Sequence, residues 1–304
     1  MAALEKGSIV VTKKPKNRFL LIHIIIFSLA VIGMMNPLYS QSPVKDSTFH
    51  PYHVNYWVTG GIFIVGIPAI LIGSPLITNK SPLTIADLQT LDRGDINPID
   101  RWALKQDPSK MGYYANLSDN TLTGIILLPA LTLFDHDIRQ DWLDIALMYA
   151  ETQIIVNDIY LYAPFGPLFQ NRYRPAVYYD ALGTSGARTT AWNRSSFYSG
   201  HVASAAAATF FTAKVFCDYY PELGCNKYLI YGAAAIPPLI EGYFRMKALD
   251  HFPSDILVGF GVGALCGILM PELHRIKIEN VSMGLYSSPV GTGISMKWNP
   301  DFLK

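Results

Sequence analysis

Residues 198–219 read YSGHVASAAAATFFTAKVFCDY, and residues 245–255, beyond a further apolar segment, read RMKALDHFPSD. A serine-glycine pair, Ser199-Gly200, and the ionisable residues stand where these hydrophobic segments begin or end: His201, Arg245, His251 and Asp255. In a helical bundle such segment ends meet on one face, where side chains from separate loops build a site. We therefore predict an all-α helical bundle with a catalytic site at one end.

The composition favours a membrane protein. Half of the 304 residues are hydrophobic and 15% are charged, whereas soluble domains carry roughly 25% charged residues. The net charge of +1 provides no basic surface, so no nucleic-acid partner is predicted. The three cysteines, Cys217, Cys225 and Cys266, lack CxxC spacing and adjacent histidines, which argues against a structural zinc site.

The N-terminal region predicts insertion into a membrane. Four basic residues between positions 13 and 18 precede an apolar run from Phe19 to Met35. This pattern is typical of a signal peptide or of an N-terminal membrane anchor, and both leave the basic end in the cytoplasm. We divide the chain into this segment at 1–40, a helical domain at 41–275 and a tail at 276–304.

Hydrophobic segments in the rest of the chain predict about six core helices that form a transmembrane bundle. Their ranges are Trp57–Ile77, Thr121–Phe134, Trp142–Tyr162, Val202–Tyr219, Lys227–Tyr243 and Asp255–Met270. Residues 79–119 are polar and are expected outside the membrane, and residues 163–200 form a long loop of the kind that carries function. The polar residues within Trp142–Tyr162 leave open a soluble bundle with a solvated face. Residues 281–298 predict a short hairpin or a flexible tail.

The ionisable residues suggest chemistry on an oxyanion. His201 follows Ser199 and Gly200 at a helix start, where backbone amides bind anions and glycine permits a close approach. The four-residue spacing of His251 and Asp255 can place a carboxylate against one imidazole nitrogen and leave the other free to attack. Arg174 and Arg245 supply guanidinium forks suited to phosphate oxygens.

Three motifs in order resemble the type 2 phosphatidic acid phosphatase superfamily, which includes vanadium haloperoxidases and bacterial class A acid phosphatases. That family reads K-x6-R-P, then P-S-G-H, then S-R-x5-H-x3-D. The matching residues here are Arg174-Pro175, Ser199-Gly200-His201 and Arg245-x5-His251-x3-Asp255. Three family positions differ, because Pro167 replaces the lysine, Tyr198 the proline and Phe244 the serine.

The resemblance implies a phosphatase that works through a phosphohistidine, without a metal ion or cofactor. His251 would attack phosphorus, Asp255 would hold its ring, and His201 would protonate the leaving oxygen and then activate water. The oxygens would be bound by Arg174, Arg245, Ser199 and the Gly200 amide. Arg172, or else Arg188 or Arg194, would compensate for the missing lysine.

The hydrophobic flanks favour a lipid phosphate as substrate, in contact with membrane lipids: phosphatidate, phosphatidylglycerophosphate, an isoprenyl diphosphate or a lipid A phosphate. Two alternatives remain, a soluble exported acid phosphatase of the same superfamily and a lipid-phosphate-binding protein with weakened turnover. The sequence indicates no oligomeric state.

Export signals and family habit predict a site on the outer, periplasmic side of a bacterial-type inner membrane. The number of predicted membrane crossings favours the opposite side. If Phe19–Met35 and the next three apolar segments all insert, residues 163–200 return to the cytoplasm. An outward site then requires that one segment does not span, and we favour Thr121–Phe134 or Trp57–Ile77. Cys217 and Cys225 would face the cytoplasm as free thiols.

Overall fold

A computed structural model describes residues 50–184, 186–275, 281–288 and 291–298 of the chain. The chain divides into two compact units, Met1–Ser47 and Thr48–Lys304, and every described residue belongs to the second. The predicted N-terminal segment at 1–40, with its apolar run Phe19–Met35, lies outside the described residues.

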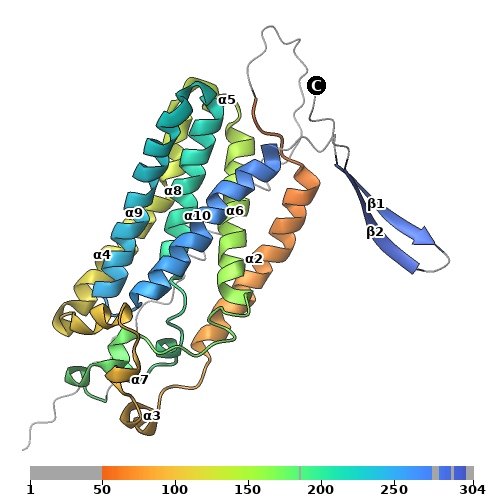
Figure 1. Cartoon of the computed structure of the whole chain (residues 1–304). Helices are drawn as coiled ribbons and strands as arrows, with labels where there is room; N and C mark the ends of the chain where they lie inside the picture. The colour runs from red at the N-terminus through yellow and green to blue at the C-terminus, as the bar shows by residue number, and fades with distance from the viewer. Residues whose placement is uncertain (1–49, 185, 276–280, 289–290, 299–304) are drawn as a thin grey trace, which may run out of the picture. The chain divides into compact units, whose positions relative to one another are not determined.

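Six long helices build the described part of the second unit, which confirms the predicted all-α bundle (Figure 1). They are α2 (Tyr56–Thr78), α4 (Met111–Ile126), α6 (Trp142–Tyr162), α8 (Gly200–Tyr219), α9 (Lys227–Lys247) and α10 (Pro253–Arg275). Shorter helices lie in the connections: α3 (Ile85–Gln89), α5 (His136–Gln140) and α7 (Gly186–Thr189). The described residues of the 163–199 connection form α7 and several single 3-10 turns, and no long helix.

The predicted hairpin at residues 281–298 is present as strands β1 (Val281–Ser288) and β2 (Gly291–Trp298). They pair antiparallel, with Val281 opposite Trp298 and Ser288 opposite Gly291.

Helix α4 begins earlier than the sequence indicated. We expected residues 79–119 outside the membrane, but α4 starts at Met111 within a helical stretch, Pro108–Phe134, that is long and apolar enough to cross a bilayer. Helix α4 is followed by the 3-10 helix η4 (Leu128–Phe134). The polar residues in its first half concealed it, although at least Ser118 and Asp119 have partners on neighbouring helices. Ser118 is fully buried and donates a hydrogen bond to Glu241, which is buried in α9.

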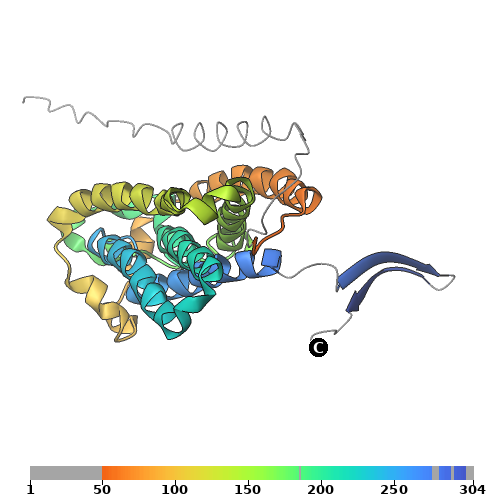
Figure 2. The same ribbon diagram turned by 90° about the horizontal axis from the view of Figure 1, so that it is seen from above.

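Helix α8 is the central helix, since it packs against α4, α6, α9 and α10 (Figure 2). Its contact with α10 is close because glycines at every fourth position of α10 face its backbone. A Cβ atom on Gly263 would lie 2.0 Å from the carbonyl oxygen of Ala203, and one on Gly259 would lie 2.5 Å from that of Ser199. Small residues spaced in this way let membrane helices approach closely. The approach brings the first turn of α8 beside the first turn of α10.

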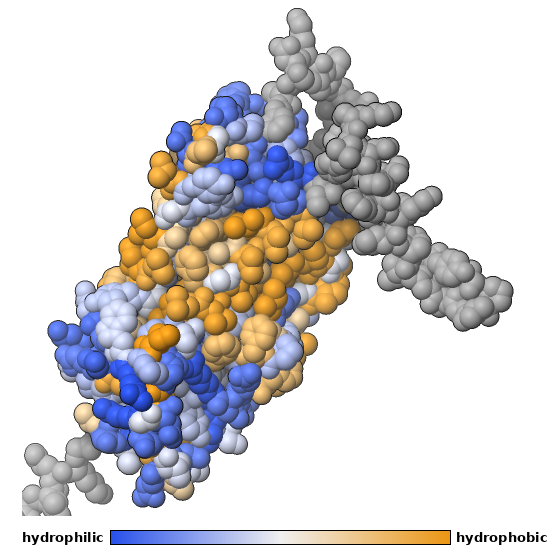
Figure 3. Space-filling view, viewed as in Figure 1, coloured by the Kyte–Doolittle hydropathy of each residue, from blue (hydrophilic) through white to orange (hydrophobic). Residues whose placement is uncertain are grey.

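The surface of the bundle is that of a membrane protein. Figure 3 shows an apolar band between two hydrophilic ends. Among the described residues three helical stretches are long and apolar enough to cross a bilayer: Tyr56–Thr78, Pro108–Phe134 and Pro253–Arg275. Large apolar side chains such as Val65, Leu229 and Leu269 project from the helices with more than half of their surface exposed. In lipid this exposure carries no hydrophobic penalty.

Candidate active site

Three segments distant in sequence meet at one end of the bundle, where α9 ends and α8 and α10 begin (Figure 1). They are the 163–199 connection, the first turn of α8, and the 248–252 link between α9 and α10. The backbone amide of Ser199 donates to the carbonyl oxygen of Asp255 at 3.1 Å, which joins two of the predicted motifs directly. The predicted site residues from all three motifs therefore lie at the same end.

Two buried arginines form the cationic part of the site. The guanidinium of Arg174 is 1% exposed and donates to the carboxylate of Asp250. The Arg245 guanidinium lies 2.9 Å from the other oxygen of the same carboxylate. Burial alone would raise the pKa of Asp250, but the charges of Arg245 and Arg174 outweigh it and hold that pKa below its usual value. Asp250 was not among the residues predicted from the sequence, where its only signal is an acidic residue next to His251.

His251 is buried and is held by a backbone carbonyl. Its Nδ1 lies 2.6 Å from the carbonyl oxygen of Ser196, which can only accept, so Nδ1 carries the proton and Nε2 keeps its lone pair. Burial, together with the charges of Arg174 and Arg245, lowers the pKa of His251 well below 6.5. The imidazole is therefore neutral at pH 7, as a nucleophile requires.

Asp255 acts on His251 through Ser196 rather than by the direct hydrogen bond that the spacing suggested. Its Oδ2 is 3.9 Å from Nδ1 of His251. The same oxygen accepts from the hydroxyl of Ser196 at 2.6 Å and from the amide of Phe252 at 2.8 Å. The carboxylate thus caps the start of α10 and fixes Ser196, and the Ser196 carbonyl fixes the imidazole ring.

Arg172 forms ion pairs with carboxylates instead of joining Arg174 and Arg245 in the cationic part of the site. It pairs with the buried carboxylates of Asp255 and Asp100, the latter at 2.5 Å. Its guanidinium also lies over the ring of Phe252, 4.8 Å from the centroid. This arrangement makes Arg172 a support for Asp255.

The two other arginines considered as substitutes for the lysine hold the 163–199 connection in place. Arg188 donates to the carbonyl oxygen of Val177 at 2.8 Å, and Arg194 donates to that of Ser81 at 2.9 Å.

His201 lies in the first turn of α8 and reaches α4. Its Nε2 is 3.3 Å from Oδ1 of Asp119, and Arg245 approaches the same carboxylate at 3.8 Å. We expected Gly200 to admit a ligand, and the structure also gives it a packing role. A Cβ atom there would lie 3.2 Å from the ring of Tyr160.

Unpaired buried polar atoms gather in this site. Within the described part of the chain, the buried side-chain atoms without a hydrogen-bond partner include Nε of Arg174, Nε of Arg245, and the hydroxyls of Ser195 and Ser199. Buried donors without partners are costly and rare in folded proteins. Two guanidinium groups and two hydroxyls are donors suited to the oxygens of a phosphoryl group.

A membrane bundle with two histidines, two buried arginines and free donors at one end defines a hydrolase of the phosphoryl-transfer class. Residues 141–279 match the family model of the PAP2 superfamily, and this part of the chain belongs to that superfamily. The match confirms the predicted family and, with it, the prediction of a PAP2-type phosphatase.

Among solved structures the chain is similar to the crystal structure of the first transmembrane PAP2 type phosphatidylglycerolphosphate phosphatase from Bacillus subtilis. The identity is 20%, the TM-score is 0.40, and the match covers 72% of this chain and 97% of that chain. Comparison with curated protein sequences gave no match.

Proposed function

We propose that this protein hydrolyses a lipid phosphate through a phosphohistidine intermediate. The observation that carries the proposal is the pairing of a neutral, buried His251, held through Nδ1, with the two buried guanidinium groups of Arg174 and Arg245. A nucleophile whose second nitrogen is free, beside two fixed cations, suits attack on an anionic phosphorus centre.

In the first step Nε2 of His251 forms a bond to phosphorus while the ester bond to the leaving oxygen breaks. His201 gives its proton to that oxygen. In the second step His201 takes a proton from water, the water oxygen bonds to phosphorus, and the bond from phosphorus to His251 breaks to release phosphate. Asp119, 3.3 Å from Nε2 of His201, orients the imidazole for these proton transfers.

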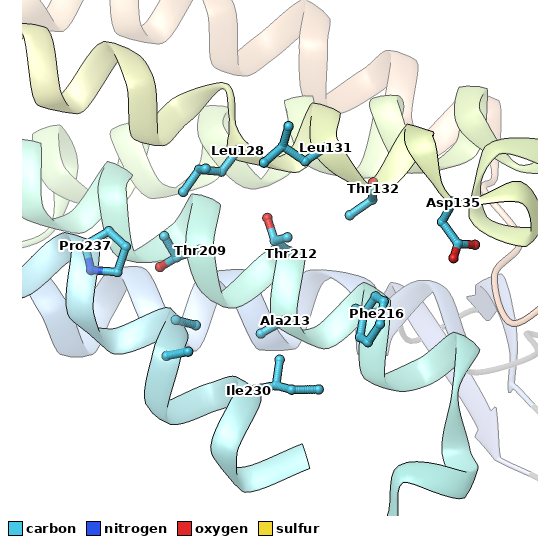
Figure 4. A pocket seen from close by; sticks show the side chains of 12 residues that line it. Leu128, Leu131, Thr132, Asp135, Thr209, Thr212, Ala213, Phe216, Ile230 and Pro237 are labelled. Carbon is cyan, nitrogen blue, oxygen red and sulfur yellow. The ribbon is translucent and has the colours of Figure 1, made fainter. Parts of the chain in front are cut away.

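The lipid character of the substrate is supported by the apolar band and by a cavity on its helices. A cavity of about 340 Å³ lies between η4, α8 and α9 (Figure 4). Its lining includes Leu128, Leu131 and Ala234, and reaches Pro237 of α9. Pro237 precedes Arg245 by eight residues, or about 12 Å along a helix axis. We infer that an acyl chain occupies this cavity when the phosphate is bound near Arg245.

Phosphate release from a panel of lipid phosphates tests this function directly. The panel contains phosphatidate, phosphatidylglycerophosphate, an isoprenyl diphosphate and a lipid A phosphate, each with and without vanadate. His251→Ala should abolish both turnover and labelled phosphoenzyme. His136→Ala is the matched control, because this exposed histidine lies on α5 at the other end of the bundle.

Three results would contradict parts of the proposal. Phosphoenzyme that persists in His251→Ala would exclude this nucleophile. Binding of lipid phosphates without release by the wild-type protein would favour the lipid-phosphate-binding alternative. Recovery of the active protein without detergent would favour the soluble alternative.

We further propose that the site faces the outside of a bacterial-type inner membrane. Helix α2, the α4–η4 stretch and α6 each run between the two ends of the bundle (Figure 1). The site therefore lies at the end opposite to residues 50–55 and to η8 (Pro221–Asn226). The structure does not support our expectation that Thr121–Phe134 or Trp57–Ile77 fails to span, because both lie in helical stretches long and apolar enough to cross a bilayer. An outward site then requires residues 50–55 in the cytoplasm, and therefore that Phe19–Met35 does not cross the membrane.

Labelling of intact cells with a membrane-impermeant thiol reagent tests this orientation. Cys225 is exposed in η8, and all three cysteines are free. Single-cysteine variants would compare Cys225 with a cysteine placed at Gln89, an exposed residue of α3 at the site end. We expect labelling at position 89 only. Labelling of Cys225 alone would place the site in the cytoplasm.

A further inference from the structure

The two arginines proposed to bind the substrate are already paired with a carboxylate of the chain itself. Asp250 offers one oxygen to Arg174 and the other to Arg245, the second at 2.9 Å. A carboxylate that bridges two guanidinium forks presents planar, anionic oxygens at hydrogen-bond distance, as a phosphoryl group does. Asp250 therefore stands where two oxygens of a phosphoryl group would bind.

The backbone around Asp250 is built to aim the carboxylate at these arginines. The preceding residue, Leu249, has a φ of 58°, a left-handed conformation that is unfavourable for a branched side chain. Its side chain is fully buried against Ala176 and Tyr179, which holds this conformation. The amide of Asp250 then donates to the carbonyl oxygen of Arg245 at 3.1 Å, so the aspartate folds back over the arginine that it neutralises.

The charges in the site lead to the same conclusion. Two arginines meet the carboxylate of Asp250, and Asp119 lies 3.8 Å from Arg245. The family lysine is absent, because proline occupies position 167. The described groups around the arginines thus carry no net positive charge, and a phosphate dianion entering beside Asp250 would meet repulsion.

We propose that Asp250 is an internal competitor for the phosphoryl position: it pairs Arg174 and Arg245 before substrate binds, and the substrate phosphoryl group displaces it. The inference rests on the proposed function, since it assigns these arginines to the substrate. The side chain of Asp250 is 22% exposed, so it can turn toward solvent when displaced. The same competition weakens the binding of free phosphate and favours release of the product.

Phosphate affinity of Asp250 variants tests the proposal. Full-length wild type, Asp250→Asn and Asp250→Ser in detergent would be titrated with inorganic phosphate by calorimetry and with vanadate as an inhibitor. Removal of one competing charged partner should tighten phosphate and vanadate binding by on the order of tenfold. Asp180→Asn is the control, because Asp180 is a 95% exposed carboxylate paired with Arg188 in the 163–199 connection.

The shift of the melting temperature by phosphate provides a second measurement, which remains usable if the unpaired arginines destabilise the variants. We expect a larger shift in both Asp250 variants than in wild type. Phosphate affinities and shifts equal to or below those of wild type would overturn the competitor role. Failure of the wild type to hydrolyse any lipid phosphate is a separate outcome that rejects the proposed function, whereas the affinity comparison tests Asp250 alone.

Discussion

Replacement of Asp255 by asparagine tests whether this carboxylate acts on the nucleophile His251 directly or through Ser196. The carboxylate lies 3.9 Å from Nδ1 of His251, and two unit charges about 4 Å apart interact by about 4 kcal/mol at an effective dielectric constant near 20. Arg172 shares the same carboxylate, so we assign half of this energy, roughly 2 kcal/mol, to the interaction of Asp255 with the His251 ring. That ring becomes cationic as it attacks phosphorus. The expected loss in kcat for Asp255→Asn is therefore about 30-fold.

The assay is steady-state phosphate release from a short-chain lipid phosphate in detergent, with the melting temperature measured in parallel. Asp137→Asn controls for the change of a carboxylate to an amide, because Asp137 is an exposed residue of α5. Ser196→Ala removes the hydroxyl bound to Asp255 but keeps the carbonyl that holds His251, so its loss should be smaller than that of Asp255→Asn. A loss near 10⁴-fold with a native melting temperature would refute the relay, because an effect of that size is typical of a carboxylate that sets the tautomer directly.

Three further predictions concern pH, helix packing and the cavity. Burial, with the charges of Arg174 and Arg245, lowers the pKa of His251, so this nucleophile stays neutral as the pH falls through 6.5. The acid limb of the pH profile of kcat/KM should therefore lie below pH 6.5. An acid limb above that value would contradict the assignment of His251 as nucleophile. In the same range the unfolded chain binds the proton first, so this histidine makes stability fall as the pH drops below 6.5. Gly263→Ala should destabilise the protein in thermal unfolding by about 1–3 kcal/mol, because its Cβ would lie 2.0 Å from a backbone oxygen of α8. Gly261→Ala is the control and should be neutral or stabilising, because a Cβ atom there meets open space. Equal effects of the two substitutions would contradict the close contact between α8 and α10. Ala234→Trp should raise KM for a long-chain lipid phosphate but not for a short-chain one, and an equal change for both would remove the acyl chain from the cavity.

Much of the bundle was predictable because hydrophobic segments are local features. Helix α6 has the predicted bounds, Trp142–Tyr162, and α2 extends the predicted Trp57–Ile77 by one residue at each end. Helix α4 was predicted too short, because polar side chains in its first half hid its start, and one of them has its partner far away in the sequence. Ser118 meets Glu241, a residue 123 positions away.

The sequence by itself determined the family, the number of long helices and the identity of the motif residues, because all three are written in short patterns of residue type and spacing. Only the tertiary structure decided how those residues are connected. It placed Asp250 between Arg174 and Arg245, and the carbonyl of Ser196 against His251. It also directed Arg172 to Asp255, 83 positions away. Such pairings depend on how closely α8 and α10 pack and on where each loop returns, and no local pattern of residues specifies these distances.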